Sequence, residues 1–314
     1  MNVLRDIDDL PGGVRFALAI GTFDGVHRGH RRVIEALTRA ARDLGAKSVA
    51  LTFDPHPSAV LRGDSPPALC DLDERLAWLS RLTVDTCVVQ HFDAAFAEQA
   101  PREFLERVSA GRDLAGLVMT QESAFGRHRE GGLDAVRRLG PELGFRVIEV
   151  PRLETRGAAL SSTRVRALLE EGRLTDVKRL LGRPYSVIGS VVRGDGRGHE
   201  LGFPTANLRF DGPVALPPDG IYAVRVGWGG DDVLSPTERR DGVASLGVRP
   251  TFEDGGARVL EVNVLDFNAD LYGKRMRVEF VRRLRGEKRF ASAAALVTQM
   301  ERDVKRARSV LATH

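Results

Sequence analysis

Between residues 14 and 150, short apolar runs alternate with longer amphipathic segments. Apolar runs of this length are typical of strands buried in a parallel sheet, and amphipathic segments are typical of helices that cover its faces. The predicted strands are residues 16–20, 49–53, 86–89, 117–120 and 146–150, and the predicted helices include 31–44, 72–82 and 101–108. Strands that alternate with helices in this way predict an α/β domain.

The pattern changes after residue 183. Two predicted helices, 162–170 and 174–181, lead to Gly182-Arg183-Pro184, where glycine and proline together end a helix. This sequence divides the chain into predicted domains of residues 1–183 and 184–314.

The second domain shows short alternating runs separated by glycine and proline turns. Its predicted strands are 185–192, 220–226, 243–246, 259–265 and 276–280, a set that favours a small antiparallel barrel. One amphipathic segment, residues 291–311, predicts a terminal helix packed on that barrel.

Composition narrows the class of protein. The chain has 314 residues, of which 42% are hydrophobic and 29% charged, as in ordinary globular proteins. The acidic start MNVLRDIDDLPGG is unlike a signal peptide, no apolar run reaches the roughly 18 residues of a membrane span, and only two cysteines occur. We therefore expect a cytoplasmic protein without a membrane partner.

Charge gives little sign of a polyanionic partner. The net charge is +4, and the basic residues are spread along the chain among acidic ones. Such a distribution is typical of a solvated surface, so no nucleic-acid partner is expected. The sequence leaves homo-oligomerisation open.

The strongest motif follows the first predicted strand, in Gly21-Thr22-Phe23-Asp24-Gly25-Val26-His27-Arg28-Gly29-His30. At a turn from strand to helix, free backbone N–H groups and the helix dipole favour an anion, and two histidines add donors. A triphosphate is the expected ligand. Paired histidines also occur as satisfied core residues or as zinc ligands, and both alternatives stay open on this pattern alone.

Two further segments of the first domain carry polar groups. Ser161-Ser162-Thr163-Arg164-Val165-Arg166 opens a predicted helix with hydroxyls and two arginines, which suits a phosphate but is also compatible with an ordinary helix N-cap. Thr52-Phe53-Asp54-Pro55-His56-Pro57 follows the second strand, where ligands of open α/β sheets usually bind.

The second domain begins with a glycine-rich segment, residues 189–199, followed by Leu201-Gly202-Phe203-Pro204-Thr205-Ala206-Asn207. Glycines here could hold phosphates or form a hairpin turn, and no GxxxxGK[ST] motif of a P-loop kinase is present. Farther along, the alternation of the strand 259–265 puts Glu261 on one face with Asn263 and Leu265. By itself Glu261 could equally be an exposed strand residue.

These motifs resemble those of a known family. The ten residues from Gly21 to His30 are similar to the FAD synthetase branch of the HxGH nucleotidyltransferases, and Ser-Ser-Thr-x-x-Arg resembles that superfamily's second signature. Pro-Thr-Ala-Asn and the strand bearing Glu261 resemble the riboflavin kinase signature. From about residue 21 to 303 the chain thus resembles bacterial bifunctional riboflavin kinase/FAD synthetases.

The resemblance implies a fold and a function. The fold is a Rossmann-like α/β nucleotidyltransferase domain followed by a small antiparallel, riboflavin kinase-like β-barrel and a C-terminal helix. The function is phosphorylation of riboflavin to FMN and adenylylation of FMN to FAD with release of pyrophosphate. ATP is the co-substrate, Mg²⁺ is the cofactor, and riboflavin, FMN and FAD are the other ligands.

One loop departs from the family pattern. Relatives usually carry Asn-Phe-x-Phe-Gly where this chain has Glu122-Ser123-Ala124-Phe125-Gly126. Two alternatives therefore stay open: a riboflavin kinase with a vestigial or redirected nucleotidyltransferase domain, and a flavin-binding regulatory protein without turnover.

The resemblance also implies roles for individual residues. His27 and His30 would stabilise charge on the phosphates during adenylylation, and Glu261 would act as base in the kinase reaction. ATP in the first domain would contact Gly21, Phe23, Asp24, Gly25, His27, Gly29, His30, Ser161, Ser162, Thr163 and Arg166, and its flavin would contact Asp54, His56, Glu122, Phe125 and Arg127. ATP in the second domain would contact Gly194, Gly196, Arg197, Gly198, Pro204, Thr205 and Asn207, and its flavin would contact Arg249, Thr251, Arg285 and Glu287. Thr205 and Asn207 would hold the metal.

Overall fold

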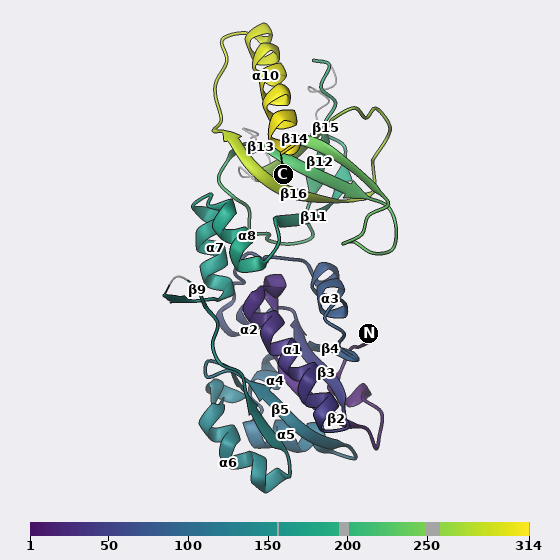
Figure 1. The fold of residues 1–314 in the computed structure, drawn as a ribbon, viewed down its shortest axis with the longest axis vertical. Helices are drawn as coiled ribbons and strands as arrows, with labels where there is room; N and C mark the ends of the chain where they lie inside the picture. The colour runs from purple at the N-terminus through teal and green to yellow at the C-terminus, as the bar shows by residue number, and fades with distance from the viewer. Residues whose placement is uncertain (156, 195–200, 249–257, 314) are drawn as a thin grey trace. The chain divides into compact units, whose positions relative to one another are not determined.

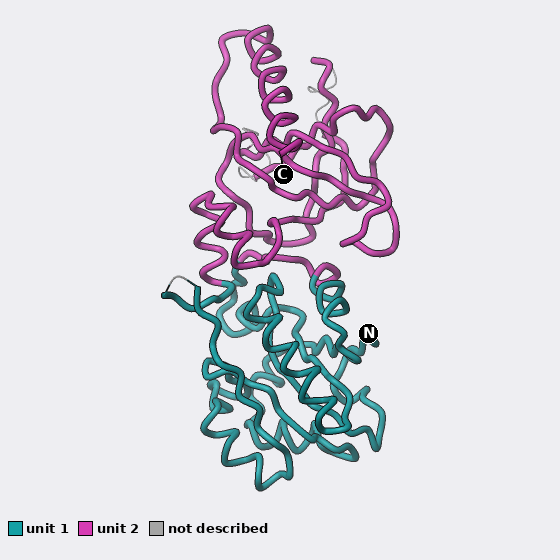
Figure 2. The backbone as a smooth tube through the Cα atoms, in the orientation of Figure 1, with its two compact units in different colours: residues 1–66, 75–162 teal, residues 67–74, 163–314 magenta. Residues whose placement is uncertain are grey.

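The computed structural model describes residues 1–155, 157–194, 201–248 and 258–313 (Figure 1). It forms two compact units, one of residues 1–66 and 75–162 and one of residues 67–74 and 163–314 (Figure 2). The predicted sites at Gly196, Arg197, Gly198, Arg249 and Thr251 lie outside the described residues. The predicted division into domains of residues 1–183 and 184–314 rests on motifs and composition, and it stays a prediction.

The first unit is built on a parallel sheet of six strands in the order β1-β4-β3-β2-β5-β8. The strands are β1 (Asn2–Leu4), β2 (Arg15–Ile20), β3 (Lys47–Asp54), β4 (Thr86–His91), β5 (Asp113–Met119) and β8 (Arg146–Glu149). Five of them match the predicted strands. The prediction missed β1, because three residues at the edge of a sheet are too few to show an apolar run.

Helices cover both faces of this sheet. The α-helices are α1 (Arg28–Asp43), α2 (Pro57–Arg62), α3 (Leu72–Ser80), α4 (Ala94–Ala97), α5 (Pro101–Ser109), α6 (Leu133–Leu143) and α7 (Ser162–Glu170), the last of which is divided between the units after Ser162. The apolar side chains of α1 and α3 pack in one core cluster, and those of α5 and α6 pack in another on the opposite face. Both clusters contain buried strand residues, which accounts for the nearly continuous apolar runs in the sequence.

Shorter elements join these layers. They are η1 (Ile7–Asp9), η2 (Asp24–Val26), η3 (Arg127–Arg129), the paired strands β6 (Ala124–Phe125) and β7 (Gly131–Gly132), and the paired strands β9 (Glu154–Thr155) and β10 (Ala158–Ala159). The two small hairpins lie outside the six-stranded sheet.

The second unit contains a closed antiparallel barrel in the order β11-β12-β15-β14-β13-β16. Its strands are β11 (Tyr185–Val192), β12 (Ala206–Arg209), β13 (Gly220–Trp228), β14 (Glu238–Val248), β15 (Arg258–Val264) and β16 (Arg275–Arg285), and α8 (Leu174–Leu181) precedes them. The prediction missed β12, since four residues beside a proline look like a turn in the sequence. The barrel and the α/β unit confirm the predicted fold class.

The terminal helix, α10 (Ala293–Leu311), packs on the barrel against β13, β14 and β16 (Figure 1). It begins two residues later than predicted, because the Ser292 hydroxyl accepts a hydrogen bond from the Ala295 amide and so caps the helix at Ser292. Ala307, Val310 and Leu311 are buried against Ala223 and Leu284 of the barrel.

A buried ion pair also ties α10 to the barrel. Arg285, at the end of β16, donates from Nε and Nη2 to the carboxylate of Asp303, with the shortest distance 2.7 Å. The two side chains are only 13% and 7% exposed, and Gln299 Nε2 donates a further hydrogen bond to Asp303. The carboxylate is therefore satisfied by partners from both elements.

A short segment of the N-terminal half of the chain belongs to the barrel unit. In residues 67–74, Ala68 forms a parallel bridge with Val214, and the Ser186 hydroxyl donates to the buried carboxylate of Glu74 at 3.0 Å. Arg275 of β16 pairs with Asp71 at 2.6 Å. Hydrogen bonds and charge thus fix this segment to a barrel that begins more than a hundred residues later.

No helix among the described residues is long and apolar enough to cross a membrane. Both cysteines are buried and unbridged. Burial raises the pKa of the Cys87 thiol to about 12, although the positive charge of Arg75 acts to lower it.

In the first unit, Asp85 joins the strand β3 to the turn before β4. Its carboxylate accepts hydrogen bonds from the Ser48 amide at 2.9 Å and from the Ser48 hydroxyl at 2.7 Å. Burial acts to raise the pKa of this carboxyl group, but the two hydrogen bonds and the Lys47 ammonium lower it more, so the pKa lies below its ordinary value of 3.8.

The variant Asp303→Ala should lower the stability of the barrel unit by about 3–5 kcal/mol, because it leaves the Arg285 charge buried without its partner. Calorimetry of the full chain would show this as a lower midpoint for one transition. Glu238→Ala is the control, since Glu238 pairs with Arg240 at 3.2 Å on the surface and should change stability by less than about 1 kcal/mol. Equal effects of the two variants would contradict a special role of the buried pair.

Asp85→Asn should destabilise the first unit at neutral pH and have little effect in acid. A carboxyl group whose pKa is lowered by folding stabilises the folded state above its unfolded pKa, near 3.8, and loses that contribution as pH falls through the folded pKa. Thermal unfolding of both proteins from pH 7 downward measures the difference. A difference that is the same at pH 7 and below pH 3.8 would refute this charge effect.

Candidate functional site

The first group of site residues lies at the carboxyl end of β2, in the middle of the parallel sheet between β3 and β5. The chain leaves β2 at Ile20, turns through η2 and enters α1 at Arg28. Phe23 and Gly25 have positive φ angles of 48° and 76° in this turn. The turn places the start of α1 at the edge where ligands of open parallel sheets bind.

His27 is the N-cap of α1. Its Nδ1 accepts a hydrogen bond of 3.1 Å from the amide of His30. A nitrogen that accepts a hydrogen bond carries no proton, so the other nitrogen, Nε2, carries the ring proton in neutral His27. The cap therefore leaves His27 with a donor at Nε2.

The two motif histidines lie against each other. Their rings stack with centroids 3.5 Å apart and planes 15° from parallel, and the Phe23 ring meets His30 edge-on at 5.5 Å. His27 is only 4% exposed. Stacking and burial together restrict both rings to one arrangement at the N-terminus of α1, where the helix dipole favours an anion.

Gly29 makes this arrangement possible. A Cβ atom at this position would lie 3.1 Å from Cε1 and Nδ1 of the His27 ring and 3.6 Å from Leu160. The first distance is shorter than carbon atoms in contact normally allow. A side chain at position 29 would therefore push the His27 ring away from its capping position.

The start of α7 adjoins the same turn. The Ser162 hydroxyl donates a hydrogen bond of 3.0 Å to the carbonyl oxygen of Asp24, so the hydroxyl holds the two motifs together within the first unit. Thr163 and Arg166 belong to the second unit, where Arg166 Nε donates to the Pro67 carbonyl at 2.7 Å.

The predicted flavin residues after β3 lie at the same edge of the sheet. Asp54 ends the strand, and His56 is the N-cap of α2, with Nδ1 accepting from the Ser58 amide at 3.1 Å. His56 thus has the same capping geometry as His27, which likewise directs the donor of the neutral ring to Nε2.

The loop that departs from the family pattern is charge-balanced. The Glu122 carboxylate pairs with Arg152 at 2.8 Å, and the Glu122 carbonyl accepts from Arg129 Nη2 at 3.1 Å. Both residues of the pair are about half exposed, so solvent screens the acid as well. Arg127, also predicted to contact flavin, has an ion pair with Glu130 at 3.8 Å.

Phe125 packs inward. Its ring contacts the Phe104 ring of α5 with centroids 5.4 Å apart, and it borders the core cluster on that face of the sheet. Packing against the core fixes the loop from Glu122 to Gly126 in place.

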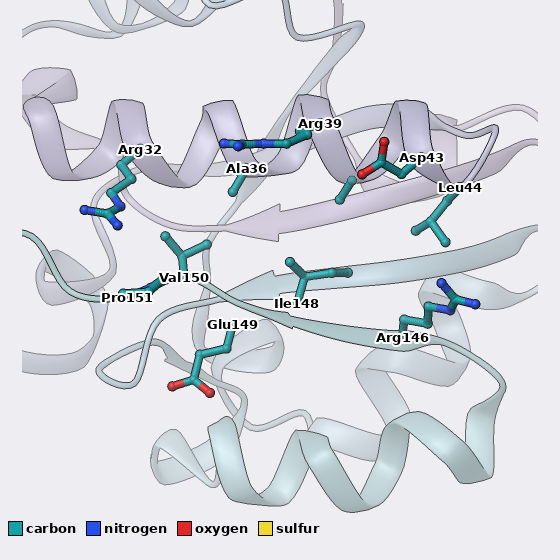
Figure 3. A pocket seen from close by; sticks show the side chains of 11 residues that line it. Arg32, Ala36, Arg39, Asp43, Leu44, Arg146, Ile148, Glu149, Val150 and Pro151 are labelled. Carbon is teal, nitrogen blue, oxygen red and sulfur yellow. The ribbon is translucent and has the colours of Figure 1, made fainter.

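A cavity of about 400 Å³ lies between α1 and the edge strand β8, and none of the predicted site residues lines it. Figure 3 shows Ala36 of α1 and Leu44, the C-cap residue after this helix, facing Ile148 of β8 across it. The motif residues His27 and His56 lie instead at the carboxyl ends of the central strands.

In the barrel, strand register brings three polar residues into one row. Asn207 of β12 lies opposite Glu261 of β15, and Glu261 lies opposite Ser245 of β14. Their neighbours Leu260 and Val262 are completely buried in the barrel, so the row faces outward. Asn263 shares this face as predicted, whereas Leu265 lies beyond the end of β15.

Two contacts hold the segment around Asn207 in place. Asn263 Nδ2 donates to the Pro204 carbonyl at 2.8 Å, which fixes the turn before β12. A Cβ at Gly194 would lie 2.2 Å from Asn207 Nδ2, so only glycine lets the chain pass this close to the amide. Thr205 lies between Pro204 and Asn207 in the same turn.

The predicted flavin residues at the end of β16 differ in their environments. Every guanidinium nitrogen of Arg285 has an acceptor, either Asp303 or the Gly286 carbonyl, and its charge lies over the Phe290 ring at 5.8 Å. The carboxylate of Glu287 lies against Gly247, where a Cβ would clash with Oε1 at 1.9 Å. Glu287 is therefore near the end of β14, and Arg285 is engaged with α10.

The described residues contain no group of three or more His, Cys, Asp or Glu that could hold a metal ion. Among these residues, the register places the neutral side chains of Asn207 and Ser245 on either side of the Glu261 carboxylate. The sequence analysis missed two features of the candidate sites. One is the ion pair of Glu122 with Arg152 in the first unit, and the other is the position of Ser245 opposite Glu261 in the barrel. Neither can be read from spacing, because both depend on segments that meet only in the fold.

Comparison with known proteins agrees with the two constellations. A family model described as FAD synthetase matches residues 14–164, and one described as riboflavin kinase matches residues 181–311. A crystal structure of a macrolide-efflux protein from Streptococcus pneumoniae is 29% identical, with a TM-score of 0.84, and the match covers 98% of each chain. That likeness extends over both units.

Sequence relatives extend over almost the whole chain. The bifunctional riboflavin kinase/FMN adenylyltransferase of Listeria monocytogenes is 33% identical over 94% of this chain and 92% of its own length. The protein of the same name from Escherichia coli is 35% identical over 96% of both chains. The chain therefore belongs to the family of bifunctional riboflavin kinase/FMN adenylyltransferases.

Proposed function

We propose that this chain phosphorylates riboflavin to FMN in its barrel unit and adenylylates FMN to FAD at the HxGH turn, with release of pyrophosphate. The observation that carries the proposal is that each family match contains its own polar constellation, the capped His27–His30 pair in one and the Asn207–Glu261–Ser245 row in the other. Both family activities use ATP, so the chain consumes ATP.

In adenylylation, an oxygen of the FMN phosphate attacks the α-phosphorus of ATP, and the bond from that phosphorus to the pyrophosphate oxygen breaks. Negative charge grows on the leaving pyrophosphate, so the protein has to supply donors that are already in place. The Nε2–H of His27 and the backbone amides in the first turn of α1 are such donors. Because FMN provides the nucleophile, no covalent bond to the protein is needed.

The charge balance at Glu122 supports flavin binding in this unit. An unpaired acid would repel the FMN phosphate, but Arg152 lies 2.8 Å from the Glu122 carboxylate and offsets its charge. We propose that Asp54, His56 and Arg127 contribute to the same flavin site. Neither the kinase-only alternative nor the non-catalytic alternative gains support from this loop.

In the kinase reaction, the terminal ribityl hydroxyl of riboflavin attacks the γ-phosphorus of ATP and ADP leaves. The hydroxyl has to lose its proton as the new bond forms, and we propose that the Glu261 carboxylate accepts it. Asn207 lies opposite Glu261 in the register, so the base and the nucleotide-binding turn occupy adjacent strands.

The donor set also fits Mg²⁺. The Thr205 hydroxyl and the Asn207 amide oxygen are hard neutral ligands, and Mg²⁺ keeps several waters and binds largely through substrate phosphates. When bound, the ion would neutralise charge on the ATP phosphates. The observation that fits is the fixed turn, in which Asn263 holds Pro204 and the close approach of Gly194 restrains Asn207.

Roles for the remaining predicted contacts follow from their positions. We propose that Arg285 and Glu287 contact flavin in the barrel unit; Arg285 is held in place by Asp303 of α10, and Glu287 borders the end of β14. Location in the cytoplasm and the lack of a nucleic-acid partner stay predictions from the sequence.

Gly29→Ala should reduce FAD formation from FMN about a hundredfold while leaving FMN formation from riboflavin unchanged. The added methyl group displaces the His27 ring, and loss of one preorganised donor costs about 10²–10³ in rate. Gly12→Ala is the matched control, because a Cβ there meets nothing closer than 3.9 Å. Steady-state assays with each flavin measure both rates, and normal FAD formation by Gly29→Ala would overturn the role of the turn.

Glu261→Ala and His30→Ala should have opposite effects. Glu261→Ala should slow FMN formation by about 10²–10⁴ and spare FAD formation from supplied FMN, since it removes only the kinase base. His30→Ala should slow FAD formation and spare FMN formation. Each variant's unaffected reaction is the control for its folding, and a joint loss in either variant would contradict separate sites.

A further inference from the structure

A second cavity, of about 590 Å³, lies on the barrel wall away from the Glu261 row. It is formed by β13, β14, β16, the residues after β15 and α10. Its lining is Arg225, Val226, Gly227, Pro236, Arg239, Arg240, Asp241, Leu265, Asp266, Arg277, Glu279 and Arg308. Five arginines face three carboxylates there, and no aromatic ring lines the cavity.

Strand register orders these charges into two rows. In one row Arg225 of β13 lies between Asp241 of β14 and Glu279 of β16. In this row a base is flanked by two acids, and Arg225 Nε lies 3.9 Å from the Asp241 carboxylate. The first row thus carries one more acid than base.

The second row lies two residues along on the same face and has no acid. Gly227 of β13 lies between Arg239 of β14 and Arg277 of β16. Because Gly227 has no side chain and Pro236 packs over it, the middle of the row is apolar. Arg239 and Arg277 therefore lie on either side of β13, and their backbones are two strand spacings apart, or about 10 Å.

Among the described residues, these two guanidinium groups also keep donors without a hydrogen-bond partner. Arg239 is exposed, and its side chain has no hydrogen bond or ion pair within the described parts of the chain. Arg277 is only 15% exposed, its Nε is buried without a hydrogen-bond partner, and its Nη2 lies 3.6 Å from Glu279. A distance of 3.6 Å is too long for a good hydrogen bond.

The other basic residues of the cavity are paired. Arg308 forms a two-point ion pair with Asp266 at 2.7 and 2.8 Å, and Arg240 pairs with Glu238 at 3.2 Å. Arg225 donates in addition to the Leu311 carbonyl at 3.2 Å. With Arg277 beside Glu279, the positive charge that has no acid among the described residues lies at Arg239, and Arg277 adds a buried Nε donor without a hydrogen-bond partner.

We propose that this cavity binds a short chain of phosphates, as found in inorganic oligophosphates and in the phosphate tail of a nucleotide. The planar guanidinium group matches phosphate oxygens in pairs, and two such groups on either side of β13 suit an anion longer than a single phosphate. The lack of an aromatic ring leaves nothing for a base to stack on, so recognition rests on the phosphates.

The site is separate from the proposed kinase site. Ser245, which lies opposite Glu261, is four residues beyond Asp241 along β14, or about 13 Å along the strand. The two sites therefore occupy different stretches of the same wall, and the oligophosphate site goes beyond the proposed function.

Calorimetric titration of the full chain with sodium tripolyphosphate, without Mg²⁺ and at low salt, tests the proposal. The double variant Arg239→Gln/Arg277→Gln should bind tripolyphosphate at one site fewer than the natural chain. Any binding at the two proposed ATP sites is the same in both proteins and cancels in the comparison. Arg282→Gln is the matched control, since Arg282 is an exposed arginine of β16 outside the cavity. The control should bind as the natural chain does.

The single variant Arg239→Gln guards against a folding effect, because its side chain is exposed and touches no core residue. It should weaken the same site about tenfold, as expected for one charge-assisted contact. Riboflavin phosphorylation by both variants, with an unchanged KM for ATP, shows that the barrel is folded and its nucleotide site intact.

A second titration with ATP distinguishes the sources of the phosphates. An equal loss for ATP and tripolyphosphate in the double variant supports recognition through phosphates alone, and a loss confined to ATP contradicts it. The proposal is also overturned if the double variant keeps every site, if Arg282→Gln loses as much, or if the loss comes with a higher KM for ATP.

Discussion

Backbone hydrogen bonding between strands sets the positions of the polar groups in both proposed sites. In the barrel, the register that puts Asn207 and Ser245 on either side of Glu261 also puts Leu260 and Val262 into the core. A shift of one residue would exchange these faces and bury the glutamate. The apolar alternation of β15 thus protects the placement of the Glu261 carboxylate that we propose as the kinase base, since the core and the proposed site share one strand.

The parallel sheet imposes a comparable constraint on the first unit. All six strands point the same way, so their carboxyl ends, with the turn at His27 and the cap at His56, gather at one edge. Both histidines end a strand-to-helix turn and use Nδ1 to cap a helix. Helix capping therefore fixes the ring orientation on which the proposed ligand binding depends, and this makes the local structure of the turn part of the proposed site.

The arginines of this chain illustrate how tertiary contacts divide like residues among different tasks. Arg285 is buried with Asp303 and holds α10, whereas Arg152 offsets the charge of Glu122 in the loop from Glu122 to Gly126. Arg239 and Arg277 lie in a row without an acid and keep unused donors. Net charge in the sequence does not distinguish these cases, because the acids that Arg285 and Arg152 contact come from other parts of the chain.

The sequence by itself determined the class of both units and most of their elements. Apolar runs of strand length and the glycine and proline at 182–184 are local features, and local features suffice to predict buried strands and a change of pattern. The motifs around His27 and Glu261 could be found for the same reason. Both are contiguous in the chain.

Only the tertiary structure decided what each motif contacts. The short strands β1 and β12 exist because longer strands pair with them, and so the sequence showed too little of them to be predicted. Likewise, Ser245 opposite Glu261, Arg152 at Glu122 and the acid-free row at Gly227 depend on pairing between distant segments. Such pairings follow from packing and register over the whole unit, and no local pattern carries that information.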